Sequence, residues 1–128
     1  GIDDTLSGLE MGAVEQIIVW ENLPHNRVEM RNSETGETVV KVLSPEQEAK
    51  NEHLEEGWSV TVKESLLEWL SNNYKNFGAK LAFISDKTPE GNQLVVGFGG
   101  LAGFLRYPLD FQPAEFHELN DDDEEGFI

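Results

Sequence analysis

The stretch VVGFGGLAGFLRY, from Val95 to Tyr107, decides how the C-terminal part of this chain folds. Gly97, Gly99 and Ala102 satisfy the pattern G-x-G-x-x-G/A, the fingerprint of a dinucleotide-binding turn. That fingerprint leads from a strand into a helix, whose N-terminus receives the pyrophosphate. Here the glycines follow the chain's predicted helices and precede GFLRY, which has the composition of a last strand. The stretch therefore predicts a helix-to-strand crossover with positive φ angles, and no cofactor.

The residues on the N-terminal side of this stretch alternate between helix and strand patterns. Thr88-Pro89 begins a short helix, and KLAFIS before it is a strand. The preceding run KESLLEWLSNNYKNFG is one helix closed by Gly78, and its apolar face is formed by Leu67, Leu70, Tyr74 and Phe77. DDTLSGLEMG and QIIVW add an N-terminal helix, with Gly12 as its C-cap, and a strand covered on both faces. This alternation predicts an α/β fold with a mostly parallel sheet.

A more polar segment, 26–64, interrupts the alternation. RVEMR and TVVKV flank the turn NSETGE as a predicted hairpin, and WSVTVK alternates as a third strand. Between them SPEQE starts a helix, with Ser44 as N-cap, Pro45 at the first position and Gln47 completing a capping box. We therefore expect a small antiparallel β-subdomain at 26–64, inserted into an α/β core made of 1–25 and 65–113.

The chain is strongly acidic, with 25 acidic against 9 basic residues and a formal net charge of −16. Seven acidic residues lie between Glu115 and Ile128, so we expect an acidic, disordered tail at 114–128. Without these seven the balance is 18 against 9, or −9, so the body is acidic as well. Nucleic-acid affinity rests mainly on Lys and Arg at phosphates. The charge therefore argues against strong free-standing nucleic-acid binding and favours a basic protein surface as partner.

The residues that carry catalysis or hold metals are missing or scattered. The chain has no cysteine and no G-x-S-x-G, H-E-x-x-H or P-loop motif. His25, His53 and His117 fall in three separate polar segments without ligand-like spacing. No apolar run approaches the ~20 residues that cross a bilayer. We therefore predict neither an enzyme nor a metal or membrane protein, and the lack of cysteine suits the cytoplasm.

Several blocks of the sequence resemble the C-terminal domain of the eukaryotic class-one translation termination factor, the peptide-chain release factor. The blocks are DDTLSGLEMGAVEQIIVWENL (Asp3 to Leu23), LSPEQE (Leu43 to Glu48), LLEWLSNNYKNFGA (Leu66 to Ala79) and GAKLAFISDKTPEGNQLVVGFGGLAGFLRYPLDF (Gly78 to Phe111), in the family's order. The resemblance implies a three-layer α/β/α sandwich with a mostly parallel sheet and an inserted small β-domain. The family's domain begins before GIDDTL, and the chain opens on Gly1 rather than Met, so we expect a piece of something longer.

The same resemblance implies partners and a binding strand. In that family the domain holds the companion GTPase release factor, an ABC-type ATPase that splits ribosomes is a second partner, and the full-length factor works on the ribosome. The GTPase-binding motif falls on Gly103, Phe104, Leu105, Arg106 and Tyr107. Phe104 stands where an isoleucine is common and Ala102 where a glycine is common; both keep the apolar character.

The family's stop-codon-reading and Gly-Gly-Gln peptide-release motifs belong to other domains and do not occur here. We therefore expect an adaptor that neither decodes nor triggers hydrolysis by itself. A Pelota-type ribosome rescue factor shares EMGAVE and LRYP-like features but lacks an inserted β-domain, so Arg27 to Lys63 favours the termination factor. A kink-turn RNA-binding protein of the same fold is a third possibility, which the acidic body opposes.

Overall fold

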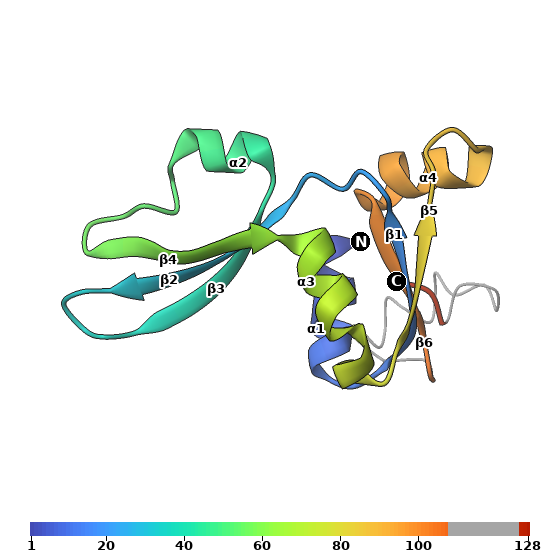
Figure 1. The fold of residues 1–128 in the computed structure, drawn as a ribbon, viewed down its shortest axis with the longest axis horizontal. Coiled ribbons are helices and arrows are strands. Elements are labelled where there is room, and N and C mark those ends of the chain that lie inside the picture. Colours follow the sequence, from blue (N-terminus) through green and yellow to red (C-terminus); the bar gives the residue numbers. More distant parts are fainter. Residues whose placement is uncertain (108–125) are drawn as a thin grey trace, which may run out of the picture. The chain divides into compact units, whose positions relative to one another are not determined.

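The computed structural model of the protein describes residues 1–107 and 126–128. Its elements follow one another as α1 (Ile2–Glu10), β1 (Val14–Trp20), β2 (Asn26–Asn32), β3 (Thr38–Leu43), α2 (Pro45–Lys50), β4 (Trp58–Ser65), α3 (Leu66–Asn73), the 3₁₀-helix η1 (Tyr74–Phe77), β5 (Lys80–Ile84), α4 (Pro89–Phe98) and β6 (Leu101–Leu105). They form two compact units, both drawn in Figure 1. We call Gly1–Asn22 with Asn73–Ile128 the α/β unit, and Leu23–Asn72 the antiparallel unit.

The α/β unit is built on a three-stranded sheet in the order β5-β1-β6 (Figure 1). Strand β1 runs parallel to β5 and antiparallel to β6. Ile17 and Val19 of β1 have no exposed surface, as the apolar run QIIVW predicts. Helices α1 and α4 both contact β1 and β6. The α/β class is confirmed, and the described strands form a mixed sheet with one parallel and one antiparallel pair.

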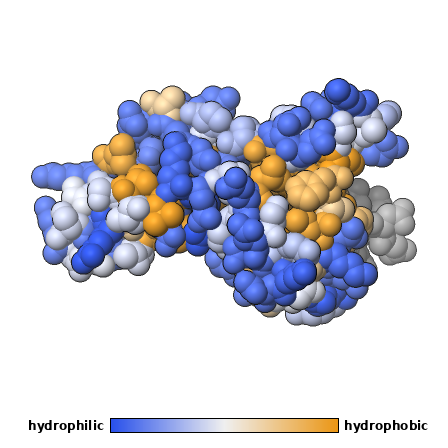
Figure 2. All heavy atoms as spheres, in the orientation of Figure 1, coloured by the Kyte–Doolittle hydropathy of each residue, from blue (hydrophilic) through white to orange (hydrophobic). Residues whose placement is uncertain are grey.

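The antiparallel unit contains a second three-stranded sheet, in the order β3-β2-β4. Strand β2 pairs antiparallel with both neighbours, which confirms the predicted hairpin and third strand. Val28 and Met30 of β2 are each 1% exposed and form the core with Leu43, against which Val39 and Trp58 pack. Figure 2 shows apolar side chains over the strands of each unit and hydrophilic ones over much of the remaining visible face.

Helix α2 begins with the capping box that the sequence predicts. The Ser44 hydroxyl accepts a hydrogen bond from the Gln47 N–H at 3.2 Å, and the Ser44 N–H donates to Gln47 Oε1 at 2.8 Å. Pro45 occupies the first turn, where no intrahelical donor is needed. The capping-box pattern in the sequence therefore predicts the start of helix α2 correctly.

The helix predicted from KESLLEWLSNNYKNFG is divided in the structure. The α-helix α3 ends at Asn73, and the 3₁₀-helix η1 continues to Gly78, whose φ of 67° closes it. The buried leucines of α3 are Leu66 and Leu70, so its buried face begins one residue earlier than predicted. Helix α3 groups with the antiparallel unit, while the predicted domain limits of 26–64 and 65–113 stay a prediction.

The predicted disordered tail, 114–128, lies outside the described residues except for its last three. Among these three, Phe127 forms an antiparallel bridge with Phe104 of β6, while the predicted tail at 114–128 stays a prediction. Gly126, Phe127 and Ile128 are uncharged and largely apolar, unlike the acidic run before them. Their packing on the apolar strand is favourable because it removes apolar surface from water. Within 1–107 and 126–128, no helix is long and apolar enough to cross a membrane.

Candidate partner-binding strand

The glycine stretch carries the chain from helix α4 into strand β6. Gly99 and Gly100 have φ angles of 73° and 98°, the left-handed region that favours glycine, whereas Gly97 lies inside α4. The Gly100 carbonyl accepts a hydrogen bond from the Trp20 N–H at 2.8 Å, which joins the start of β6 to the end of β1. The predicted helix-to-strand crossover is therefore confirmed.

One side of β6 packs tightly inside the α/β unit. Leu101 has no exposed surface, and Leu105 is 7% exposed. A Cβ atom on Gly103 would lie 3.2 Å from Val14 Cγ1 and 3.4 Å from Thr5 Cγ2, so α1 approaches β6 closely at this glycine. Gly103 and Leu105, two of the five predicted site residues, therefore serve the unit's own core.

The other predicted site residues face outward. Phe104 is 42% exposed and Tyr107 is 53% exposed. Arg106, between Leu105 and Tyr107, is exposed as well. The structure thus divides the motif into an inward pair and an outward set of three.

Arg106 is held in place by backbone carbonyls of its own unit. Its Nε donates to the Gly12 carbonyl at 3.2 Å, and its Nη2 donates to the Phe77 carbonyl at 3.3 Å and to the Gly78 carbonyl. The Gly12 carbonyl follows the end of α1, and the Phe77 and Gly78 carbonyls lie at the end of η1; a positive charge is favoured at helix C-termini by the helix dipole. Arg106 therefore has a structural role, which sequence reasoning did not anticipate.

Residues 126–128 pair with the edge of β6 that faces away from β1. The Leu105 N–H donates to the Gly126 carbonyl at 2.5 Å, and the Ile128 N–H donates to the Gly103 carbonyl at 2.7 Å. The Phe127 ring lies 4.8 Å from the Phe104 ring, centroid to centroid. Sequence reasoning missed this contact, although three uncharged residues after an acidic run were a signal.

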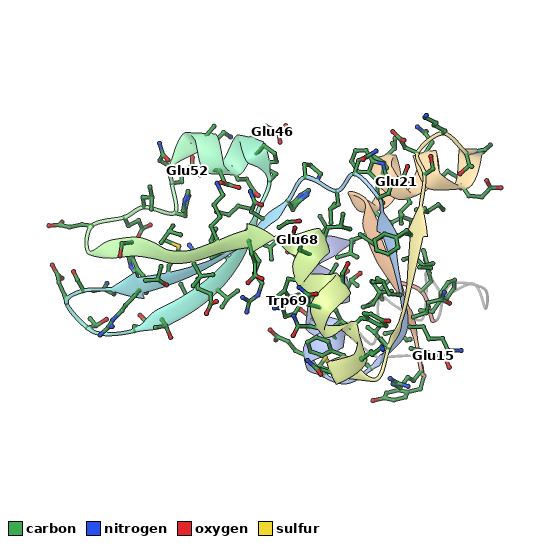
Figure 3. The ribbon with its side chains drawn as sticks, viewed as in Figure 1. Glu15, Glu21, Glu46, Glu52, Glu68 and Trp69 are labelled. Atoms are coloured by element: carbon green, nitrogen blue, oxygen red, sulfur yellow. The ribbon has the colours of Figure 1, made fainter. Side chains whose placement is uncertain are left out.

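A charged cluster ties the antiparallel unit together. Arg27 Nη1 lies 3.3 Å from Glu29 Oε2 and 3.2 Å from Glu64 Oε2. Its guanidinium also lies 4.8 Å from the centre of the Trp69 ring, which projects from α3 in Figure 3. Because the Arg27 guanidinium has its partners within the antiparallel unit, we interpret this cluster as stabilising the fold of that unit.

A second ion pair in the same unit joins α2 to the sheet. Lys63 of β4 lies 2.5 Å from Glu48, and Asn26 of β2 donates to the same carboxylate at 2.6 Å. The hydrogen bond from Lys63, and then that from Asn26, lower the pKa of Glu48. Glu48 is thus held as a carboxylate by donors from two strands.

The histidines form no metal site in the described part of the chain. Burial lowers the pKa of His25, against the opposing charge of Glu46. His25 and His53 are half-buried, and His117 lies outside the described residues. No group of three or more His, Cys, Asp or Glu residues within 1–107 and 126–128 is placed to hold a metal ion.

Comparison with known proteins gives one consistent result. The family model described as eRF1 domain 3 matches residues 1–109. Eukaryotic peptide chain release factor subunit 1-1 of Arabidopsis thaliana is 51% identical over 132 residues, covering 97% of this chain and 30% of that protein. Eukaryotic peptide chain release factor subunit 1 of Loxodes striatus is 42% identical, covering 100% of this chain and 29% of that protein. The chain therefore spans about 30% of the length of these relatives.

A solved structure has the same fold. The C-terminal domain of a peptide chain release factor from Methanosarcina mazei aligns with a TM-score of 0.63 and 25% sequence identity. The alignment covers 80% of this chain and 65% of that one. Family match, relatives and fold agree, and the chain belongs to the eRF1 domain 3 family of release factors.

Proposed function

We propose that this chain is the adaptor domain of a peptide-chain release factor and acts in translation termination in the cytoplasm. Its role is to bind rather than to catalyse, and its partner is the companion GTPase release factor. The ABC-type ribosome-recycling ATPase and the ribosome are further partners of the full-length factor. Membership of the eRF1 domain 3 family supports this proposal, because the relatives are peptide chain release factors.

The proposal that this chain binds the GTPase rests on the exposure of Phe104 and Tyr107. Both aromatic rings lie on or next to β6, and both are about half exposed at 42% and 53%. Exposed aromatic residues are frequent anchors of protein interfaces. Arg106, fixed between them by carbonyls of its own unit, adds a positive charge in a defined position. These three side chains form the proposed contact surface, and Gly103 and Leu105 support it from inside.

The two alternative functions fit less well. The antiparallel unit at Leu23–Asn72 favours the release factor over a Pelota-type rescue factor, whose domain lacks such an insert. The net charge of −16 opposes a kink-turn RNA-binding protein. The glutamates labelled in Figure 3 come from several elements, among them β1, α2 and α3.

Calorimetric titration with the C-terminal region of the companion GTPase tests the proposal. We expect Phe104→Ala and Tyr107→Asp each to weaken binding by at least about 10-fold, or about 1.4 kcal/mol, because each removes an anchor from the interface. Phe83→Ala is the matched control, since Phe83 is 54% exposed on β5, the opposite edge strand of the same sheet.

Thermal unfolding of each variant shows first that the chain is folded. Binding that responds to Phe83→Ala but not to Phe104→Ala and Tyr107→Asp would move the interface away from β6. A folded chain that binds no GTPase at all would reject the adaptor role for this chain.

A further inference from the structure

Strand β3 is an edge strand of the antiparallel unit and pairs regularly along its whole length. In the order β3-β2-β4, its only partner among the described strands is β2 (Figure 1). The register with β2 contains no shift from Thr38 to Leu43. The other edge strand, β4, is interrupted by an extra residue, Thr61, whose hydroxyl donates to the Glu29 carbonyl at 3.1 Å. Because a bulge disturbs the ladder that a further strand needs, β3 is the better edge for one.

Hydrogen bonds of the β2–β3 hairpin show which backbone groups of β3 point away from the sheet. The Asn32 N–H donates to the Glu37 carbonyl at 2.8 Å. In an antiparallel ladder, successive pairs of opposite residues alternate between hydrogen-bonded and non-hydrogen-bonded. Every second residue of β3 from Val39 onward therefore bonds to β2. The N–H and carbonyl groups that face the outer edge are those of Thr38, Val40 and Val42.

On one face of the sheet, this edge carries aliphatic side chains. Val40 is 51% exposed, and Val42 is half-buried. Glu29 of β2 lies opposite Val40, and Val62 of β4, itself 43% exposed, lies on the far side of Glu29. An aliphatic side chain of an added strand, placed opposite Val40, removes exposed apolar surface from water.

On the other face, the edge carries a lysine. Val28 of β2 lies between Lys41 of β3 and Lys63 of β4. Glu48 of α2 lies 2.5 Å from Lys63 and neutralises its charge. Lys41 is exposed and forms no ion pair within residues 1–107 and 126–128. A carboxylate on an added strand, directly opposite Lys41, supplies the kind of partner that Glu48 supplies to Lys63.

We propose that the outer edge of β3 accepts an extended strand of another protein, in which an acidic residue stands between two aliphatic ones. Recognition is by β-augmentation: the backbone of β3 supplies the hydrogen bonds, and Val40 and Val42 select the aliphatic side chains. Lys41 selects the carboxylate, because an unpaired lysine on an edge disfavours strands that offer it none. A second copy of this chain is the poorer occupant, since each copy carries a net charge of −16.

Hydrogen exchange of the free chain tests whether the edge of β3 is open. We expect the amides of Val40 and Val42 to exchange at least about 10-fold faster than the amide of Val39, which is bonded to β2. Slow exchange of Val40 and Val42 would show that the chain itself covers the edge, and would overturn the proposal. Slow exchange that appears only at high protein concentration would make a second copy the occupant and would overturn it as well.

A peptide supplied in trans tests the selection of side chains. The probe is acetyl-Lys-Val-Glu-Val-Val-Thr-Lys-amide, which in antiparallel pairing places its glutamate opposite Lys41 and its central valine opposite Val40. One control peptide has lysine in place of the glutamate, and a second has its central valine N-methylated, which removes an N–H that pairs with β3. We expect the probe to shift the NMR amide signals of Thr38, Val40 and Val42 and to bind at least about 3-fold more tightly than either control.

A charge reversal on the edge should reverse the choice of peptide. We expect Lys41→Glu to bind the lysine peptide at least about 3-fold more tightly than the probe. Lys50→Glu makes the same charge change at an exposed lysine of α2 and, as the matched variant, should keep the wild-type preference. Thermal unfolding shows that both variants are folded. Equal binding of all three peptides by the wild type, or an unchanged preference in folded Lys41→Glu, would overturn the proposal and leaves the GTPase contact on β6 unaffected.

Discussion

A single methyl group at position 103 tests how closely α1 packs on the sheet. The Cβ of an alanine there would lie 3.2 Å from Val14 Cγ1, 3.3 Å from the Gln16 carbonyl oxygen and 3.4 Å from Thr5 Cγ2. Because two of the neighbours belong to β1, they have little freedom to move aside. We expect Gly103→Ala to lower the free energy of unfolding by about 1–3 kcal/mol, measured by urea denaturation.

Gly97→Ala is the matched control, with an expected effect of opposite sign. Gly97 lies inside α4, its φ is not positive, and a Cβ there would meet nothing within 4 Å. Alanine is the better helix former, so we expect a gain of about 0.5–1 kcal/mol. Equal effects of the two substitutions would show that α1 does not press on β6 at Gly103.

The motif at Gly103–Tyr107 shows what the sequence could predict at the residue scale. GFLRY was recognisable as a strand from its composition, and β6 covers its first part. The sequence does not show which residues of β6 face inward, because a five-residue strand has too few alternating positions to distinguish its two faces. The three carbonyls around Arg106 belong to residues 12, 77 and 78, and such contacts between distant segments leave no local pattern.

At the scale of elements, Glu48 connects helix α2 to strands β2 and β4, and this makes the antiparallel unit sensitive to acid. Its pKa is lowered in the folded chain by hydrogen bonds from Lys63 and Asn26. A lowered carboxyl pKa contributes stability above the ordinary value of 4.5, and this contribution is lost as the pH falls through the folded value. We therefore expect the unit to lose stability below about pH 4.5.

Thermal unfolding between about pH 6 and about pH 3 measures this loss. Glu48→Gln should be less stable than the wild type at the higher pH and should approach it at the lower one. Glu46→Gln, on the same helix, removes a carboxylate without touching Lys63 or Asn26 and is the control. If Glu48→Gln loses stability with acid as steeply as the wild type does, the link through Glu48 is not responsible.

Local signals explain which elements were predictable. Helix α2 was found from the capping box of Ser44 and Gln47, and the start of α4 from Thr88 followed by Pro89. The division of the third helix at Asn73 was missed, because the apolar spacing from Leu67 to Phe77 suits an α-helix throughout. A change from α-helical to 3₁₀ winding depends on tertiary packing, which periodicity does not record.

At the scale of the whole molecule, the α/β class and the inserted antiparallel sheet were predictable, because both follow from the order of the elements. The return of residues 126–128 to β6 was not. Phe104 and Phe127 are 23 positions apart, and an acidic run with the composition of a disordered segment lies between them. A pairing between such distant positions depends on an available strand edge, and that edge exists only once β6 is formed.

The charge of the whole molecule leads to the last prediction. Because binding to RNA requires cations at the phosphates, a net charge of −16 should keep the Kd for a kink-turn RNA weaker than about 100 µM, the weak end of non-specific binding. Fluorescence anisotropy with a labelled kink-turn RNA measures it.

A variant with Asn or Gln at the five acidic positions 121–125 separates the tail from the body, since its charge is −16 + 5 = −11. The body remains acidic in this variant, so we expect its affinity for the RNA to stay as weak as that of the wild type. Binding that appears only in this variant would mean that the acidic run masks an RNA-binding surface on the body. Binding below about 1 µM by the wild type, weakening steeply with salt, would instead favour the RNA-binding function over the adaptor.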